Sequence, residues 1–168
     1  MRPVTEPAVR ASFVNCSKGE AKRLAVPKEL DAQPWADLDF LGWRDPSAPQ
    51  RAYLVAESGA GLVGVALRVA PRTGLARRSM CSLCLTTHTG DGVALMSALK
   101  AGPAGRQGDS VGAYLCSDLA CSFFLRGTKD AGERLEETLT LAQKIERTTA
   151  NLAAFLDKVG LPTHDRAR

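Results

Sequence analysis

Four of the five cysteines stand in two close pairs, and this spacing is the feature of the sequence most directly tied to chemistry. Cys81 and Cys84 form a CxxC motif, and Cys116 and Cys121 form a wider CxxxxC motif. A CxxC turn directs two thiolates to one side of a tight loop, and a second pair can complete a tetrahedral Cys₄ site for one Zn²⁺ ion. Four sulfur ligands leave no open coordination position, so we predict a structural metal.

The elements around the wider pair indicate how the ligands are positioned. Cys116 ends a strand predicted over residues 111–115, and Asp118 is placed to cap a short helix that has Cys121 in its first turn. Amide N–H groups and the helix dipole favour a thiolate there. A knuckle, a β-hairpin and a helix that carries the last ligand make up a treble clef. The predicted fold class is therefore α+β: a treble-clef zinc-binding domain with an antiparallel β-sheet and a long C-terminal helix.

Other interpretations of the cysteines are open. A thioredoxin-type CxxC needs a helix directly after its first cysteine, whereas residues 85–90 read as a loop. Two disulfides would require an oxidising compartment, and tetrahedral sulfur ligation also suits iron. His88 could replace one cysteine as a ligand, but we interpret it as a loop residue near the site. Cys16 is either a small buried residue or a reactive thiol at a helix start.

Composition places the chain in a broad class. Its 168 residues, 45% of them hydrophobic, are consistent with one domain that has its own core. It contains no apolar run long enough to cross a membrane and no signal peptide, so we expect a cytoplasmic protein. The formal net charge is +4, and several arginines cluster near the cysteines. This favours an anionic partner surface, either acidic protein or RNA, and a solvated basic face is the alternative. The arginines that lie near the cysteines in the sequence are Arg68, Arg72, Arg77, Arg78, Arg106 and Arg126.

In the first half of the chain we expect an N-terminal tail over residues 1–10, followed by one domain over residues 11–160. Ser17 and Glu20 form a capping box for a helix over residues 18–26. Two β-rich runs, 51–57 and 62–69, are separated by a glycine-rich turn and predict a hairpin. The aromatic residues expected in the core are Trp35, Phe40 and Trp43.

In the second half we expect strands over residues 76–80 and 93–101, and a flexible hairpin tip over 102–108. The tip lacks the Gly-Lys-Ser/Thr of a phosphate-binding loop. Apolar residues at three- and four-residue steps predict one helix over 131–159, ended by Gly160 and followed by a C-terminal tail over 161–168. Its stripe packs on the sheet or serves as a partner surface. The stripe consists of Leu135, Leu139, Ala142, Ile145, Thr149, Leu152, Leu156 and Val159.

Three segments resemble a known family. Residues 12–23, 77–84 and 108–122 are similar to the opening, the first zinc knuckle and the second zinc knuckle of the elongation factor G-binding domain, the C-terminal treble-clef domain of FusB-type fusidic-acid-resistance proteins. The similarity extends over nearly the whole chain. It implies one structural Zn²⁺, held by the four paired cysteines, and a domain that binds elongation factor G and promotes its release from the ribosome. Resistance members carry an additional N-terminal helical bundle, so we expect only the factor-binding half here.

The leading hypothesis is thus a non-enzymatic, zinc-stabilised module that binds elongation factor G, with no small-molecule substrate and no membrane partner. The alternative is an RNA- or ribosome-binding zinc module. An enzyme would need Cys16 and His88 as nucleophile and base, and nothing in the sequence brings them together. Interfaces are enriched in aromatic residues and arginine. The candidate partner-binding residues are Leu83, Arg106, Tyr114, Phe123, Phe124 and Arg126.

Overall fold

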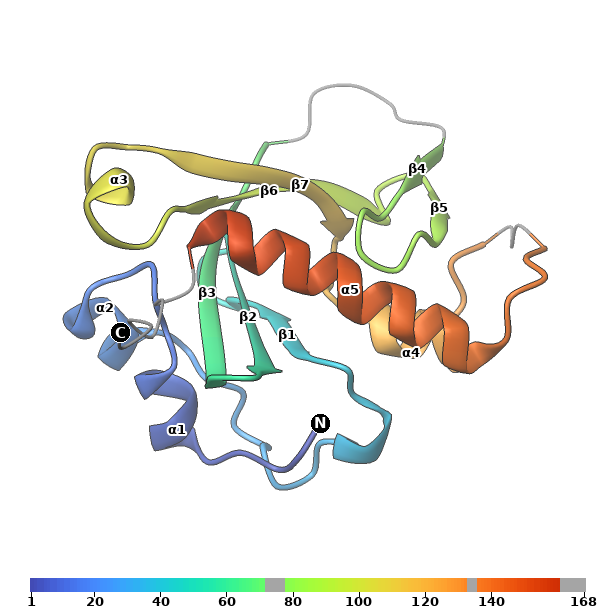
Figure 1. The fold of residues 1–168 in the computed structure, drawn as a ribbon, viewed down its shortest axis with the longest axis horizontal. Coiled ribbons are helices and arrows are strands. Elements are labelled where there is room, and N and C mark those ends of the chain that lie inside the picture. Colours follow the sequence, from blue (N-terminus) through green and yellow to red (C-terminus); the bar gives the residue numbers. More distant parts are fainter. Residues whose placement is uncertain (72–77, 133–135, 161–168) are drawn as a thin grey trace, which may run out of the picture.

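The computed structural model describes residues 1–71, 78–132 and 136–160, and within them the fold is α+β (Figure 1). An antiparallel sheet has the strand order β1-β2-β3-β6-β7, and a second, two-stranded sheet pairs β4 with β5. The strands of the first sheet are β1 (Leu41–Arg44), β2 (Arg51–Ser58), β3 (Gly61–Val69), β6 (Val93–Leu99) and β7 (Ser110–Cys116); those of the second are β4 (Arg78–Met80) and β5 (Thr87–Thr89). The helices are α1 (Glu6–Ala11), α2 (Lys18–Arg23), a 3₁₀ turn η1 (Trp35–Asp37), α3 (Gly102–Arg106), α4 (Cys121–Arg126) and α5 (Leu141–Val159).

The two faces of the sheet enter separate buried clusters, because successive residues of a strand point to opposite sides. On one face, Leu54 and Val65 belong to the cluster that includes Leu152 of α5. On the other, Tyr53 belongs to the cluster that includes Val9 of α1. Helix α5 crosses in front of β2 and β3 (Figure 1). The sheet is therefore covered by α5 on one face and, over β1 to β3, by the N-terminal segment on the other.

The sheet is held together at its middle by a side chain as well as by strand pairing. Strands β3 and β6 pair only at Arg68↔Ser97 and Val69↔Met96. Beyond that point the Asn15 side chain bridges the two strands. Its Nδ2 donates to the Ala66 carbonyl at 2.9 Å and to the carbonyl of Leu99, at the end of β6, at 3.0 Å, and its Oδ1 accepts from the Ala66 amide at 2.8 Å. The β6–β7 hairpin thus extends away from β3, fixed by the segment between α1 and α2.

The prediction of an N-terminal tail over residues 1–10 is wrong. Residues 6–11 form α1, with Val9 fully buried. The Arg10 guanidinium donates to the carbonyls of Ala21, Lys22 and Leu24 at 2.8–3.0 Å, which satisfies the end of α2. The Ser17–Glu20 capping box is confirmed, although α2 ends at Arg23 rather than Val26. The domain therefore begins before residue 11.

The long C-terminal helix is confirmed, but it begins about ten residues later than predicted, at Leu141. Thr140 and Gln143 form a capping box: Thr140 Oγ1 accepts from the Gln143 amide at 3.3 Å, and Gln143 Oε1 accepts from the Thr140 amide at 2.9 Å. The helix ends at Val159, and Gly160 adopts a left-handed conformation with φ 91°. None of the described helices combines the length and apolar character needed to cross a membrane.

The predicted stripe on α5 is partly correct. Leu152, Leu156 and Val159 are buried against the sheet. Ala142 and Thr149 are exposed, however, and Thr148 and Phe155 are buried instead. The Thr148 hydroxyl donates to the Lys144 carbonyl at 2.8 Å, so a polar residue occupies the interface without an unpaired group. Leu135 lies outside the described residues.

Most of the remaining predictions are confirmed. The β2–β3 and β6–β7 hairpins form, and Trp35, Phe40 and Trp43 are buried. Of the strand predicted over 76–80, the part that is described, β4, pairs with β5. The prediction of a flexible hairpin tip over residues 102–108 is wrong, because this segment contains the short helix α3. A Cβ at Gly105 would lie 1.7 Å from the Lys100 carbonyl oxygen, so glycine lets this helix pack on the end of β6.

Candidate metal centre

The four paired cysteines converge on one buried point. The sulfur atoms of Cys81, Cys84, Cys116 and Cys121 all lie within 4.8 Å of one another. Cys81 Sγ is 3.7 Å from Cys121 Sγ, and Cys84 Sγ is 3.6 Å from Cys116 Sγ. Each cysteine is at most 1% exposed. The pairs that are adjacent in sequence therefore interleave, so that each ligand of the first knuckle lies against a ligand of the second.

This arrangement fits a zinc ion. Sulfur atoms bonded tetrahedrally to Zn²⁺ at about 2.3 Å are about 3.8 Å apart, close to the two shortest sulfur–sulfur separations. A disulfide would need about 2.0 Å, and all five cysteines are free thiols. Four thiolates would hold the ion at full coordination, and the ion would join two loops and a helix at the edge of the core.

The elements around the site match the predicted treble clef. The first knuckle lies between β4 and β5, Cys116 ends β7, and Cys121 is the first residue of α4. The prediction that Asp118 caps α4 is wrong. Its Oδ1 accepts instead from the Ala120 amide at 3.0 Å, within the loop that precedes the helix. Cys121 still lies in the first turn, where free amides favour a thiolate.

Two leucines close the ligand loops in a conformation that is unusual for their type. Leu85 and Leu119 both have φ 56°, a left-handed conformation that costs a non-glycine residue roughly 1–2 kcal/mol. The Leu85 amide donates to the Cys81 carbonyl at 3.0 Å, and the Leu119 amide donates to the Cys116 carbonyl at 2.9 Å. Both hydrogen bonds tighten a loop around its metal ligands. Backbone strain of this kind is concentrated at functional sites.

His88 lies beside the site without joining it. Its Nε2 is 3.3 Å from Cys116 Sγ, and its ring meets the Phe124 ring edge-on, with centroids 4.6 Å apart. The residue is on β5 rather than in a loop, and it is 3% exposed. Next to a metal-bound thiolate, an Nε2–H group would donate to the sulfur and stabilise its charge. The interpretation of His88 as a neighbour of the site rather than a ligand agrees with this geometry.

Asn151 was missed by sequence reasoning. Its Nδ2 donates to the Leu83 carbonyl at 2.9 Å and thereby attaches α5 to the first knuckle. A second attachment comes from Arg126 of α4, whose guanidinium binds both carboxylate oxygens of Asp39 at 2.7 and 3.1 Å. Spacing along the chain contains no signal for either contact, because the partners are 68 and 87 residues apart.

The pKa values of two thiols in the site are shifted in opposite directions. Hydrogen bonds from Cys116 and Cys121 lower the pKa of Cys81. Hydrogen bonding to Cys116 and Cys81, together with burial, raises the pKa of Cys121. Four buried thiolates in contact repel one another, so a divalent cation is the natural partner that allows all of them to lose their protons.

Residues 8–159 match the family described as FBP C-terminal treble-clef zinc-finger. The chain belongs to this family. It is the FusB-type C-terminal domain that the two cysteine segments indicated, and its four buried cysteines are placed to bind one structural zinc ion.

One solved structure shows the same fold. The treble-clef domain matches the fusidic acid resistance protein FusC with a TM-score of 0.52 and 16% identity. The match covers 83% of this chain and 53% of FusC, so the chain spans about half the length of that protein. No curated protein matches the sequence.

The structure separates the candidate partner residues of this zinc-finger protein. Leu83 is 1% exposed, so its prediction as a partner-binding residue is wrong; the exposed residue of the turn is Ser82. Arg106 is exposed on α3 but lies at the end of the β6–β7 hairpin far from β4 and β5 (Figure 1), not near the cysteines. Tyr114 is 57% exposed and remains available to a partner.

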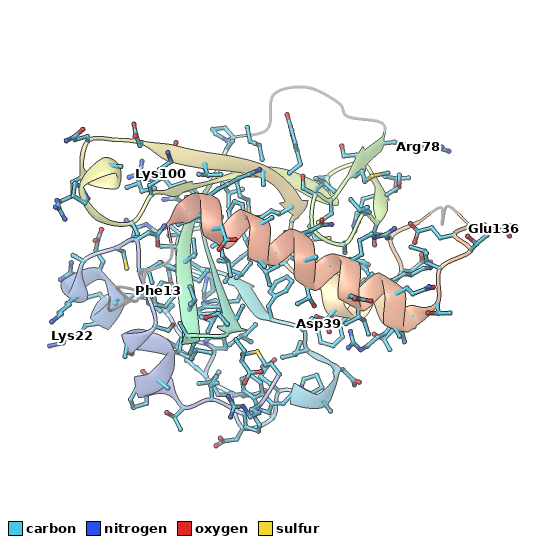
Figure 2. The ribbon with its side chains drawn as sticks, viewed as in Figure 1. Phe13, Lys22, Asp39, Arg78, Lys100 and Glu136 are labelled. Carbon is cyan, nitrogen blue, oxygen red and sulfur yellow. The ribbon has the colours of Figure 1, made fainter. Side chains whose placement is uncertain are left out.

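The residues after the last ligand are mainly structural. Phe123 and Phe124, both candidate partner residues, are half-buried, and each packs against a different cluster. The Arg126 side chain is only 15% exposed and is committed to Asp39, which lies below α5 in Figure 2. Among the other arginines, Arg68 and Arg78 are exposed. Arg72 and Arg77 lie outside the described residues.

Cys16 is separate from the metal centre. It is half-buried and packs against the N-terminal cluster. Burial raises its pKa, with a smaller contribution from the Glu20 carboxylate, so the thiol is less reactive than a free cysteine. The packing interpretation therefore agrees with the structure, and the reactive-thiol interpretation does not.

Proposed function

We propose that this chain is a zinc-stabilised module that binds elongation factor G and promotes its release from the ribosome. The proposal rests on membership of the FusB-type treble-clef family and on the four-cysteine site. A similar fold in the fusidic acid resistance protein FusC supports it at the level of architecture. The role that we propose is binding rather than catalysis, because four thiolates at one ion leave no position for a substrate.

The contact surface that we propose is the knuckle surface, defined as Met80, Ser82 and Tyr114. Met80 is 47% exposed and Tyr114 is 57% exposed. The Ser82 amide donates to the Tyr114 carbonyl at 2.7 Å, so the first knuckle and β7 form one rigid surface. Tyrosine and methionine are enriched in interfaces, and a surface that is ordered before binding loses little entropy when it docks.

The mechanism that we propose is a shift between states of the factor. A bound module moves such an equilibrium only by its difference in affinity for the two states. It must therefore bind the released form of the factor more tightly than the ribosome-bound form. A tenfold difference, about 1.4 kcal/mol, would change the ratio of the two forms tenfold.

Calorimetric titration of purified elongation factor G into the zinc-loaded protein tests the binding step. We expect a complex at micromolar concentration. Met80→Ser combined with Tyr114→Ala should weaken it at least tenfold, because the exposed apolar area of the surface is removed. Leu141→Ala is the matched control, since Leu141 is also an exposed apolar residue, 45% exposed, but begins α5 instead. No heat at micromolar concentration, or equally weakened binding in both variants, would refute the proposed surface.

Release is tested separately with labelled factor on ribosomes stalled by fusidic acid. We expect the protein to accelerate dissociation of the factor in a concentration-dependent way. A protein that binds the free factor but leaves this rate unchanged would support binding and exclude release.

A further inference from the structure

One face of the main sheet is left partly uncovered by the fold. The N-terminal segment packs on the face that carries Tyr53 and Val55, but only over β1 to β3. Further along the same face, Leu95 and Leu99 of β6 are each 41% exposed and Tyr114 of β7 is 57% exposed. On the opposite face, Met96, Ala98 and Leu115 are buried in the cluster that includes α5 and the four cysteines. The open part of the face is therefore the outer side of the β6–β7 hairpin together with the adjacent ends of β2 and β3.

A row of residues crosses the sheet on this face. Strand pairing places Arg51 opposite Arg68, Arg68 opposite Ser97, and Ser97 opposite Gly112. Directly opposed residues of an antiparallel sheet point to the same side. The row thus begins with two guanidinium groups and continues over two residues with little or no side chain. Leu95 is paired with Tyr114, and this pair lies next to Ser97 and Gly112 on the same face.

The positive charges of Arg51 and Arg68 are not neutralised by a salt bridge within the described residues. Like charges directly opposite each other on a sheet are destabilising, and both residues are exposed. Among the described residues, Arg51 and Arg68 take part in no salt bridge. Arg51 interacts with the Tyr53 hydroxyl and acts at longer range on the Glu20 carboxylate, which is itself used in the capping box of α2. An anion placed on the row would relieve this repulsion.

We propose that this open face binds single-stranded RNA. Phosphates would contact Arg51 and Arg68, the backbone would pass over Ser97 and Gly112, and a base would stack on the Tyr114 ring. Strand spacing and rise place Tyr114 roughly 12 Å from Arg68, measured between backbones. Basic groups beside an exposed aromatic ring on a flat sheet are the combination that single strands use, with phosphates bound electrostatically and bases stacked.

An acidic protein segment fits this face less well. A carboxylate-rich strand could neutralise the arginines, but it makes no specific use of an aromatic ring next to Ser97 and Gly112. A base needs a flat ring on which to stack, and the small size of Ser97 and Gly112 allows the strand to lie close to the sheet. The face thus has a function of its own, which goes beyond binding of elongation factor G. Only Tyr114 belongs to both surfaces.

Fluorescence anisotropy with a labelled 12-nucleotide single-stranded RNA of mixed sequence tests the inference. We expect micromolar binding at low salt that weakens as salt rises. Arg51→Gln with Arg68→Gln should weaken binding at least tenfold and reduce the slope of log affinity against log salt by about 1.4, or about 0.7 for each phosphate that is no longer neutralised. Tyr114→Ala should weaken binding roughly tenfold, and Tyr114→Phe should retain binding because the ring is preserved.

A charge-matched control is Lys28→Gln with Lys158→Gln, two exposed lysines outside the row. If this control weakens binding as much as the arginine pair, the binding is non-specific and the inference is wrong. No binding by the wild type, or displacement of RNA by an equal concentration of an acidic 12-residue peptide, would also overturn it.

The same variants distinguish this inference from the proposed function. The arginine pair lies outside the knuckle surface, so Arg51→Gln with Arg68→Gln should leave the affinity for elongation factor G within about twofold. Binding of RNA without binding of the factor would refute the proposed function but not this inference. Binding of the factor without binding of RNA would refute this inference but not the proposed function.

Discussion

The loop between the second pair of ligands packs closely on strand β1, and residue types alone do not predict this contact. Leu119 lies in the loop between the second pair of ligands and is 3% exposed. It approaches β1 so closely that a Cβ at Gly42 would lie 2.5 Å from Leu119 Cβ and 3.1 Å from its carbonyl oxygen. Gly42 is therefore glycine because a ligand loop packs on it, and not because of its own backbone conformation.

We predict that Gly42→Ala destabilises the protein by roughly 1–3 kcal/mol, because the added methyl group must displace Leu119 or the strand. Urea unfolding of the zinc-loaded protein measures the change. Gly59→Ala is the matched control, since a Cβ there meets nothing within 4 Å, and it should shift the free energy of unfolding by no more than about 0.5 kcal/mol. Equal stability of the two variants would show that Leu119 does not pack against β1 in this way.

His88 gives a second prediction at the residue scale. His88→Ala should lower zinc affinity roughly 10- to 100-fold while leaving one zinc per chain, because it removes a group that supports a ligand and not a ligand. Competition with a chromogenic chelator measures the affinity, and elemental analysis measures the stoichiometry.

Thr89→Ala, a change at an exposed residue on the same strand, is the control and should leave zinc affinity unaltered. Loss of the metal from His88→Ala under conditions where the wild type is saturated would instead identify His88 as a ligand.

At the scale of elements, capping decided where the longest helix begins. Apolar residues at helical spacing extend well before Leu141, and periodicity alone cannot say where such a pattern stops being a helix. The Thr140–Gln143 capping box supplies two hydrogen bonds that a longer helix would lose. The sequence contains this signal, so a closer reading of Thr140 would have placed the start of α5 correctly.

We predict that Thr140→Ala costs about 1 kcal/mol of stability, since the first turn of α5 loses its side-chain acceptor. Thr149→Ala is the matched control: it removes an exposed threonine in the middle of the same helix, and alanine is the better helix former. The control should therefore be neutral or slightly stabilising in the same thermal unfolding experiment. A Thr140 variant as stable as wild type would indicate that the helix is not capped there.

Across the whole molecule, the metal centre is part of the main core. The four cysteines belong to the same buried cluster as Leu152 of α5 and Leu54 of β2. Loss of the ion would leave four thiols buried in that core, while α4 would still be held by the packing of Phe123 and Phe124 and by the Arg126–Asp39 pair. The N-terminal cluster, in contrast, contains none of the four cysteine ligands.

We predict that Cys121→Ser releases zinc and lowers stability by at least about 4 kcal/mol, a decrease of the size that removal of a structural metal produces. Thermal unfolding and metal content measured on the same sample test this. Cys16→Ser, outside the site, should retain one zinc and lose far less stability. Full metal content in the Cys121 variant would contradict the four-sulfur site.

The sequence by itself determined the metal ligands, the β-hairpins, the capping of α2 and the family. Each of these depends on residues close together in the chain, such as Cys81 with Cys84 or Ser17 with Glu20, so spacing alone carries the information. Only the tertiary structure decided that Leu83 is buried, that Arg106 lies far from the metal, that Arg126 is committed to Asp39, and that Arg51 and Arg68 share an open face with Tyr114. Burial and pairing between distant segments depend on how sheet and helices pack, and that packing is determined by the whole chain and not by any local pattern.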